Sequence, residues 1–392
     1  METKYIMQQM MRWYGPDDTV SLRDILQSGC SGVVTALHQI PVGDVWTVEA
    51  INERKAMIEA EGLKWTVVES LPVSEAIKTQ SEDCALHIEN YKESLKNLAE
   101  CGIKVVTYNF MPILDWLRTD PFHVRPDGTK TLRFEWLDFV IADWLLLQRP
   151  GSEKAYSDED KVRAQKKYDE MPQEQRDQLF RNILLGLPGS KEAFTPEGIL
   201  EALKAYVDID AKKLKEHLLH FLQEVSPVAE SSGVQLAIHP DDPPYSVLGL
   251  PRIVSTEDDV KDILSFSPES ANGLCFCTGS FGARADNDIP GMISRYGDRI
   301  HFVHLRNTVR DEEGNFEEGE HLNGDTDMVE VVSRLLDLMK QRQVRLPMRP
   351  DHGFQMMDDL NKDTYPGYTG IGRMKGLAEL RGLELGLAYN KK

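Results

Sequence analysis

Hydrophobic and polar positions repeat one pattern along most of the chain. A short run of β-branched or aromatic residues is followed by a polar turn, and the turn leads to an amphipathic stretch that ends near a glycine. Such runs are typical of buried strands, and stretches with apolar residues three and four apart are typical of helices. The eight predicted strands cover residues 6–14, 31–38, 64–70, 104–110, 234–240, 273–277, 299–305 and 344–350.

Helices fit between these strands. Ser21 is placed to cap a first helix that stops at Gly29. Further helices are predicted over residues 48–62, 90–102, 210–233 and 372–389. Strands that alternate with helices in this way favour a closed (β/α)8 TIM barrel, with residues 1–392 as a single domain. An open, doubly wound sheet is the alternative.

The pattern breaks between the fourth and fifth strands. Residues 111–210 are rich in charge and their pattern is mainly helical, so they predict a helical insertion after strand four. Loops that follow barrel strands emerge at the carboxyl-end face, where barrel enzymes carry their active sites. We therefore expect the insertion to lie near that face, either as a cover over the site or as an oligomer contact.

Residues that commonly bind metals fall at the carboxyl ends of strands five to eight. They are His239, Cys277, His304 and Asp351. Alternation along strand five gives Leu236 and Ile238 one face, so His239 takes the other face and points into the barrel mouth. The same alternation along the other three strands points Cys277, His304 and Asp351 inward. Cys275 also points inward, but one layer deeper, so it is expected to fill the barrel interior.

Each of these residues alone is weak evidence for a site. A single strand-end histidine is more often a satisfied polar side chain, and a single cysteine is usually core packing. Four neighbouring strand ends that each offer one ligand type predict a shared divalent metal ion. Their nitrogen, sulfur and oxygen donors suit a borderline ion.

The predicted barrel mouth is polar, as a hydroxylated substrate requires. His38, Asn109, Arg306 and Arg349 are the residues expected to bind it, and Glu69 also ends a strand there. The two arginines, together with the metal, supply the local positive charge that an anionic substrate needs. The alternative for each of these residues is the capping of a loop or a surface salt bridge.

Two residues near the eighth strand are candidates for proton transfer. His352 follows the expected ligand Asp351 and is placed to reach the substrate without binding metal. Tyr368 lies in the glycine-rich segment PGYTGIGR, where a phenol can act as an acid or a hydrogen-bond donor. The alternative for Tyr368 is a packed aromatic in a turn, and Tyr365 lies close by.

Composition narrows the function further. With 45 Lys+Arg against 64 Asp+Glu, the formal net charge of -19 opposes binding to nucleic acid or to an anionic membrane surface. The 5 cysteines are irregularly placed and predict reduced thiols instead of a disulfide framework. The start of the chain lacks a signal-peptide pattern, so a cytoplasmic location is expected.

Several segments together resemble the mannonate dehydratase family. They are RWYGPDDTVSL, GVVTALHQIPVGDVW, YNFMPILDW, AIHPDDPP, CTGSFGARADND, HLNGD and MRPDHG, and the likeness extends over essentially the whole chain. The resemblance implies a β/α barrel that removes water from D-mannonate to give 2-dehydro-3-deoxy-D-gluconate in hexuronate (glucuronate) breakdown, with Mn²⁺ or Fe²⁺ as cofactor. A homo-oligomer, most simply a dimer, is also expected.

By motif, the resemblance assigns the metal ligands to the same four residues that the strand-end argument selects. They are His239, Cys277, His304 and Asp351. It also assigns catalysis to His352 and Tyr368. The competing hypotheses are a metal-dependent sugar isomerase on the same barrel, a zinc nuclease and a sugar-acid sensor without catalysis; the negative charge disfavours the nuclease.

Overall fold

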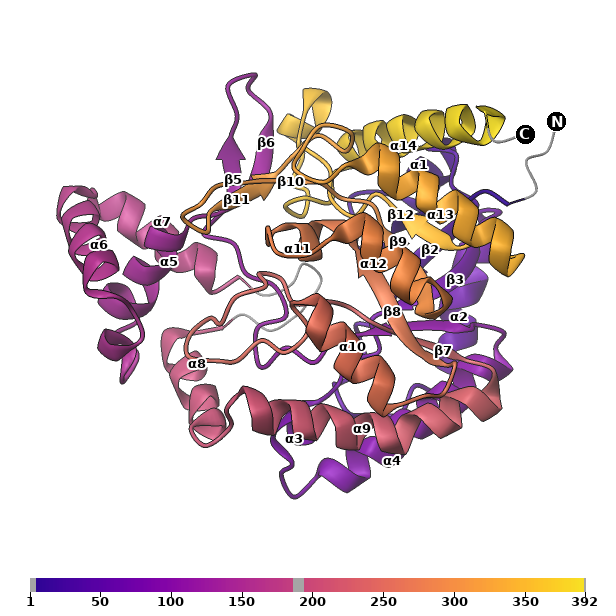
Figure 1. Cartoon of the computed structure of the whole chain (residues 1–392), viewed down its shortest axis with the longest axis horizontal. Coiled ribbons are helices and arrows are strands. Elements are labelled where there is room, and N and C mark those ends of the chain that lie inside the picture. Colours follow the sequence, from indigo (N-terminus) through magenta and orange to yellow (C-terminus); the bar gives the residue numbers. More distant parts are fainter. Residues whose placement is uncertain (1–4, 186–193, 391–392) are drawn as a thin grey trace.

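A closed barrel of parallel strands forms the centre of the computed structural model, which describes residues 5–185 and 194–390 (Figure 1). The strands follow one another round the barrel in the order β1, β12, β9, β8, β7, β4, β3 and β2. Their bounds are β1 Gln8–Arg12, β2 Gly32–Thr35, β3 Lys64–Glu69, β4 Val105–Tyr108, β7 Gln235–Ile238, β8 Asn272–Cys277, β9 Ile300–His304 and β12 Pro347–Arg349. The prediction of a TIM barrel is confirmed, and the open sheet is excluded.

Helices cover the outside of the barrel. They are α1 Leu22–Gln27, α2 Val48–Ala60, α3 Glu75–Thr79, α4 Cys84–Glu100, α9 Ala211–Ser232, α10 Glu257–Phe266, α11 Thr278–Gly282, α12 Ile289–Tyr296, α13 Met328–Arg342 and α14 Gly370–Asn390, with short 3-10 turns η4 Gly297–Arg299 and η5 Met357–Asn361. Ser21 caps α1 through a capping box with Asp24, as predicted. The helix predicted to start at residue 90 starts earlier, at Cys84, because Cys84 and Ile88 extend its buried face.

Alternation along the strands separates two apolar layers. Leu236 and Ile238 pack outward in the main core between sheet and helices, whereas Ala237 faces the barrel interior, as predicted. The interior layer consists of Met10, Val34, Val67, Val105, Ala237, Cys275 and Phe302. Cys275 therefore fills the barrel, and the predicted parity of strands five to seven is correct.

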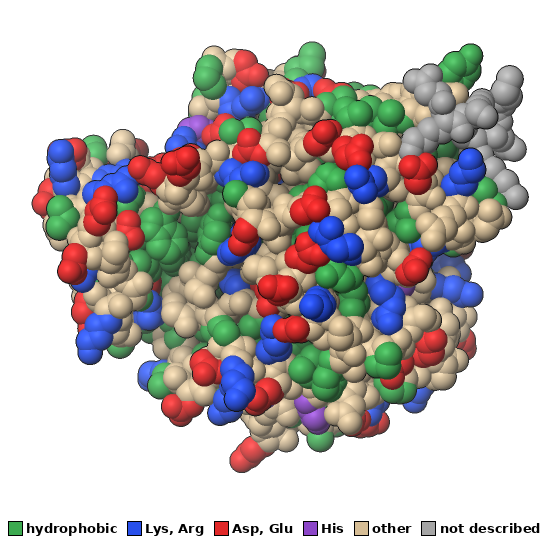
Figure 2. Space-filling view, viewed as in Figure 1, with side chains coloured by type: hydrophobic (Ala, Val, Ile, Leu, Met, Phe, Trp, Pro, Cys, Tyr) green, Lys and Arg blue, Asp and Glu red, His purple; other side chains and the backbone are tan. Residues whose placement is uncertain are grey.

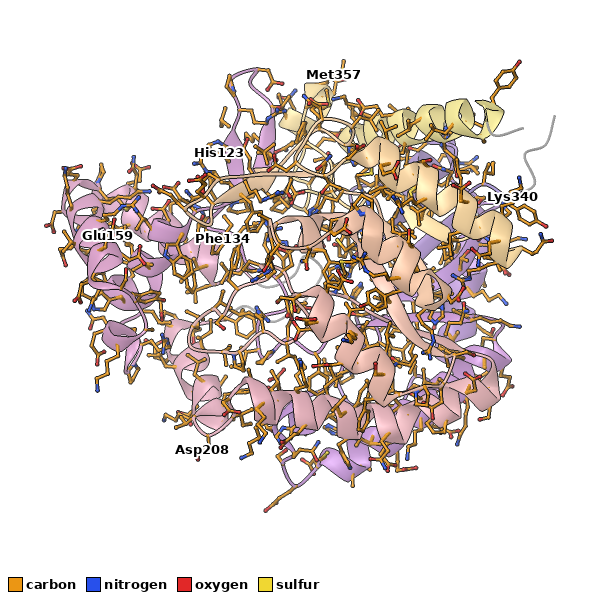
Figure 3. All side chains as sticks on the ribbon, in the orientation of Figure 1. His123, Phe134, Glu159, Asp208, Lys340 and Met357 are labelled. Carbon is orange, nitrogen blue, oxygen red and sulfur yellow. The ribbon has the colours of Figure 1, made fainter. Side chains whose placement is uncertain are left out.

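The segment between β4 and α9 contains helices, but it also contains a hairpin that the sequence analysis missed. Its elements are β5 Asp120–Val124, β6 Lys130–Phe134, α5 Trp136–Val140, the π-helix η1 Ile141–Leu146, η2 Ser152–Lys154, α6 Asp158–Glu170, α7 Gln173–Ile183, α8 Pro196–Leu203 and η3 Lys204–Tyr206. Part of the predicted insertion, residues 186–193, lies outside the described residues. Helices α5 to α7 form a lobe beside the barrel (Figure 1), with Glu159 of α6 and Lys340 of α13 on opposite sides of the molecule (Figure 3).

The hairpin joins a second, antiparallel sheet, which we call the rim sheet. Its strand order is β10–β11–β6–β5, where β10 Thr308–Arg310 and β11 Phe316–Glu318 follow barrel strand β9. Phe316 pairs with Phe134, and their rings stack 5.5 Å apart. The loops after β4 and β9, which are far apart in the sequence, thus build one sheet at the carboxyl-end face of the barrel.

The loop after β12 is pressed against the start of α14. An added Cβ on Gly372 would lie 2.1 Å from the carbonyl oxygen of Phe354, and one on Gly353 would lie 2.3 Å from the backbone nitrogen of Arg373. Only glycine permits such an approach of two backbones. This contact fixes the loop that carries His352.

The surface mixes both signs of charge. Acidic and basic side chains are interspersed on the face seen in Figure 2, and hydrophobic side chains gather in the hollow between the lobe of α5 to α7 and the barrel. Within the described residues, no helix combines the length and the apolarity needed to cross a membrane.

Candidate active site

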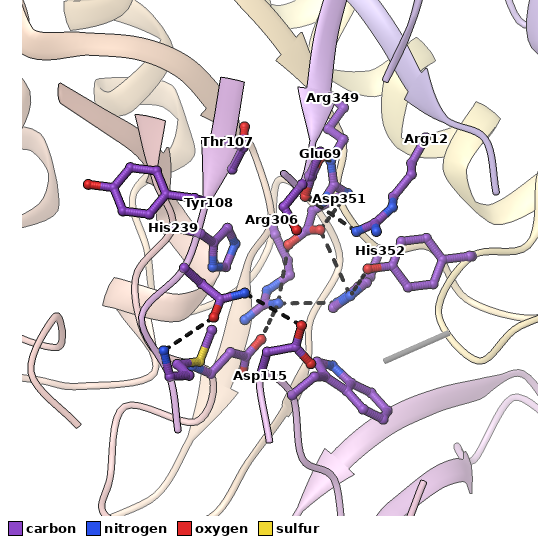
Figure 4. A pocket seen from close by; sticks show the side chains of 16 residues that line it. Arg12, Glu69, Thr107, Tyr108, Asp115, His239, Arg306, Arg349, Asp351 and His352 are labelled. Carbon is purple, nitrogen blue, oxygen red and sulfur yellow. Dashed lines mark hydrogen bonds and ion pairs between the residues drawn. The ribbon is translucent and has the colours of Figure 1, made fainter. Parts of the chain in front are cut away.

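A polar layer lies directly above the apolar barrel interior. It follows from alternation, because the residues two positions further along the same strands face the same way. The layer includes Arg12, Glu69, Thr107, His239, Cys277, His304 and Arg349, which come from β1, β3, β4, β7, β8, β9 and β12 or the residue directly after. All of them except Cys277 and His304 are among the residues that line the pocket at the barrel mouth (Figure 4).

Three side chains of this layer form a compact group of metal-binding donors. One ligand atom each from His239, Cys277 and His304 lies within 4.8 Å of the others. Two ligands on one ion, at bond lengths of about 2.3 Å, are at most about 4.6 Å apart, so the group is close to the size that an ion requires. The structure thus brings together three of the four residues that were predicted to share an ion.

The chemistry of the donors also fits an ion. Nδ1 of His239 lies 2.6 Å from the carbonyl oxygen of Pro240, which leaves Nε2 for a ligand role. Nδ1 of His304 is buried and has no hydrogen-bond partner among the described residues. Burial lowers the pKa of His239, which favours the neutral imidazole that a metal ion needs.

Asp351 lies beside this group but is not part of it. The predicted eighth strand is shorter than expected: β12 ends at Arg349, and Pro350 has no N–H to continue the ladder. Asp351 follows with a positive φ of 63°, so it is not a strand residue as the parity argument assumed. Its Oδ2 is 3.6 Å from Sγ of Cys277, and its Oδ1 is 2.5 Å from Nη1 of Arg349.

Buried arginines and carboxylates alternate around the pocket. Arg349 donates two hydrogen bonds to Glu69, at 2.6 and 2.8 Å, and Nη1 of Arg306 lies 2.9 Å from Asp242 and 3.2 Å from Asp351. Figure 4 shows Arg306, Arg349, Glu69 and Asp351 facing one another. Burial raises the pKa of Asp351, but the charge of Arg349 outweighs it and holds the pKa well below its ordinary value. The carboxylates in this network are therefore charged.

His352 and Tyr368 meet at the edge of the pocket. Nε2 of His352 is 3.3 Å from the hydroxyl oxygen of Tyr368, and the two rings are nearly perpendicular. Both side chains are buried and line the pocket. Burial raises the pKa of Tyr368, so its phenol keeps its proton at neutral pH. Tyr365 packs instead against Tyr14, with ring centroids 4.8 Å apart, so of the two tyrosines only Tyr368 contacts His352.

The predicted substrate-binding residues lie in two neighbouring places. Arg306, Arg349 and Asn109 line the pocket, as does Glu69. His38 lies outside it, in the larger groove that continues from the pocket and shares Asn109 with it. The sequence analysis placed His38 at the mouth because it assumed a second strand that ended at residue 38, but β2 ends at Thr35.

Other pocket residues were missed. Arg12 was predictable, since it lies two residues beyond the interior Met10 on the first strand. Asp115, Trp116 and Asp242 also line the pocket, but they come from irregular loops after β4 and β7, where no periodicity indicates direction. The first part of the predicted insertion thus contributes side chains to the pocket wall.

Comparisons with known proteins cover nearly the full chain. Residues 7–392 match the sequence model of a family described as UxuA, D-mannonate dehydratase. A mannonate dehydratase from Marinomonas sp. (strain MWYL1) is 53% identical over 387 residues, which is 97% of this chain and 99% of that protein. One from Chromohalobacter salexigens is 49% identical over 383 residues, which is 96% of this chain and 98% of that protein.

Solved structures give the same picture. The crystal structure of mannonate dehydratase from Streptococcus suis serotype 2 matches with a TM-score of 0.78 and 33% identity, over 99% of this chain and 95% of that one. A xylose isomerase-like TIM barrel protein from Mycobacterium smegmatis matches with a TM-score of 0.53 at 13% identity, over 100% of this chain and 99% of that one. The second likeness shows the shared barrel fold alone.

Proposed function

The chain belongs to the D-mannonate dehydratase family, and we propose that it is a hydro-lyase that removes water from D-mannonate to give 2-dehydro-3-deoxy-D-gluconate. The observation that carries this proposal is the pocket itself, which is lined by His239 of the compact donor group, by Arg306 and Arg349, and by the His352–Tyr368 pair. A sugar acid offers the carboxylate and hydroxyl groups that such a pocket would bind.

His239, Cys277 and His304 would hold a divalent ion, Mn²⁺ or Fe²⁺, with Asp351 as a further ligand. A thiolate, two imidazoles and a carboxylate suit an ion of borderline softness better than Mg²⁺ or Ca²⁺, which prefer oxygen ligands. A bound ion supplies Lewis-acid stabilisation of the negative charge that grows on the substrate carboxylate, which contributes several kcal/mol.

Dehydration requires two proton transfers at neighbouring carbons. A base takes the hydrogen from C2, the electron pair of that bond forms the C2=C3 double bond, and the C3 hydroxyl accepts a proton and leaves as water. The resulting enol moves its hydroxyl proton to C3 and becomes the 2-keto acid. Nε2 of His352 and the hydroxyl of Tyr368, only 3.3 Å apart at the pocket edge, are the groups to which we assign the two transfers.

The arginines orient the substrate in this scheme. Arg306 and Arg349 are held in place by buried carboxylates, so their guanidinium groups need no reorganisation when an anion enters. Asn109 offers an amide to a hydroxyl group from the opposite wall, and His38 would contact the part of a ligand that extends into the groove.

The test is a product assay on purified protein. We expect D-mannonate with Mn²⁺ or Fe²⁺ to yield a 2-keto-3-deoxy acid, and we expect the epimeric aldonates to react far more slowly. Formation of a ketose from an aldose instead would identify a sugar isomerase, and no turnover on any aldonate would contradict the proposal. Metal analysis of the protein as purified, and of the same protein after EDTA treatment, tests the dependence on an ion.

Three further proposals follow from the resemblance. They are a role in hexuronate breakdown, a cytoplasmic location and a homodimer. Cell fractionation and light scattering of the purified protein test the last two, and growth of a deletion strain on glucuronate tests the first.

A further inference from the structure

Glu318 lies in the rim sheet, outside the barrel, and contacts His352, a residue of the pocket wall. It is the last residue of β11, and its side chain is buried. Its Oε1 lies 3.0 Å from Nδ1 of His352, on the side of the imidazole ring opposite to Tyr368. The barrel thus supplies His352, and a separate sheet supplies the group behind it.

The available hydrogens decide which group donates the hydrogen bond between His352 and Glu318. Nη1 of Arg306 also lies 3.2 Å from Nδ1 of His352, but its two hydrogens have better acceptors in Asp242 at 2.9 Å and in Asp351 at 3.2 Å, both charged. The carboxylate of Glu318 can only accept a hydrogen bond. Nδ1 of His352 therefore carries a hydrogen and donates it to Glu318, and Nε2 presents its lone pair to Tyr368 and the pocket.

Glu318 is itself held by two arginines. Nη2 of Arg118, a fully buried residue just before β5, lies 3.3 Å from Oε1 of Glu318, and Nε of Arg306 lies 3.2 Å from its Oε2. Burial raises the pKa of Glu318, but the charge of Arg306 outweighs it and holds the pKa below its ordinary value. The carboxylate is therefore charged and fixed in position.

We propose that Glu318 is a positioning residue for the dehydration, which fixes both the ring orientation and the Nδ1-protonated form of His352. The inference rests on the proposed function, in which His352 moves a proton at Nε2. A histidine whose second nitrogen is held by a carboxylate cannot turn its ring or exchange tautomers freely, so its reactive nitrogen stays directed at the substrate.

Kinetics of Glu318 variants test the proposal. We expect Glu318→Ala to lower kcat by about 10- to 100-fold with a KM changed only a few-fold and an unchanged metal content. Glu318→Gln should recover a large part of kcat, because its amide oxygen still accepts from Nδ1. The matched control is Glu317→Gln, the preceding residue of β11, which pairs with His123 at the surface and should leave kcat unchanged.

A double-mutant cycle separates positioning from a general structural role. In the His352→Ala background, Glu318→Ala should cause no further loss of kcat, since the residue acts through His352. A full additional loss there, or wild-type kinetics for Glu318→Ala in an otherwise active enzyme, overturns the inference. If Glu318→Ala does not fold, the cycle is run with Glu318→Met, which keeps most of the side-chain volume but offers Nδ1 of His352 no acceptor oxygen, and an additive loss decides in the same way. A wild-type protein without dehydratase activity would instead refute the proposed function.

Discussion

Cys275 and Cys277 are two residues apart on β8 and have different environments. Both face the barrel interior, but Cys275 lies in the apolar layer and Cys277 lies one layer higher, in the donor group with His239 and His304. The difference was predictable from the sequence, because strand alternation gives direction and distance from the strand end gives depth. The direction and depth of Asp242 and Asp115 could not be predicted, because these residues lie in irregular loops without a fixed alternation.

The first prediction at this scale concerns Cys277. Replacement by serine should lower the amount of bound metal, because a hydroxyl is a poorer ligand than a thiolate for a borderline ion. Cys275→Ala serves as the control: it removes a contact of 3.3 Å between Sγ and Nε2 of His304, but it should retain the metal, since this sulfur lies in the apolar layer below the donor group. Elemental analysis of both variants after dialysis gives the answer, and equal metal contents would exclude Cys277 as a ligand.

The second prediction at the residue scale concerns His352. Its replacement by alanine should lower kcat by about 10²- to 10⁴-fold, the usual contribution of a proton-transfer group, while the bound metal stays in place. Steady-state kinetics and metal analysis on one preparation check both parts. His123→Ala is a suitable control, since His123 lies on the surface hairpin in Figure 3 and not in the pocket. Full activity of His352→Ala would refute the assignment.

Secondary-structure elements differ in how far their sequence reveals them. The barrel strands and the covering helices α1, α2, α4, α9 and α14 were predicted because each has its own local pattern, such as the buried run of β9 or the Gly233 stop of α9. The rim sheet was missed because its strands are short and pair with partners far along the chain. β10 and β11 have three residues each, too few for alternation to be recognised.

The contact between the loop after β12 and helix α14 gives a prediction at this scale. Gly372→Ala should destabilise the fold by roughly 1–3 kcal/mol and lower kcat, because the added Cβ would displace the backbone next to His352. Gly382→Ala, on the same helix in open space, should instead stabilise by about 0.5–1 kcal/mol. Chemical denaturation measures both changes, and equal stabilities of the two variants would contradict the close approach.

At the scale of the whole molecule, the last helix is tied to the first strand. Glu384 of α14 is buried and accepts a hydrogen bond of 2.6 Å from the backbone N–H of Met7, just before β1. Burial raises the pKa of Glu384 to about 7, so deprotonation in the folded state occurs well above the ordinary range of a glutamate. The ends of the described chain are therefore joined by a group that titrates near neutrality.

This tie gives a pH-dependent stability. Because the folded state holds the proton more tightly than the unfolded state, the charged carboxylate costs stability that grows above pH 4.5 and is complete above about pH 7. Glu384→Gln should therefore be more stable than the wild type at pH 8, by roughly 1–3 kcal/mol, and the advantage should vanish near pH 4.5. Urea denaturation at both pH values measures it. The control Glu379→Gln, at a surface ion pair, should show no comparable gain in stability at pH 8. If the stability difference between Glu384→Gln and the wild type is the same at both pH values, Glu384 does not titrate in this range.

The rim sheet has a consequence for attempts to transplant parts of this protein. Barrel folds support many chemistries through variation of the loops at the carboxyl-end face, so a single loop is a natural unit to transfer onto another scaffold. Here a graft of the loop after β4 would carry β6 without its partner β11, and the reverse graft would leave β11 without β6. Either chimera would expose an open strand edge and be prone to aggregate, so the two loops form one transferable unit.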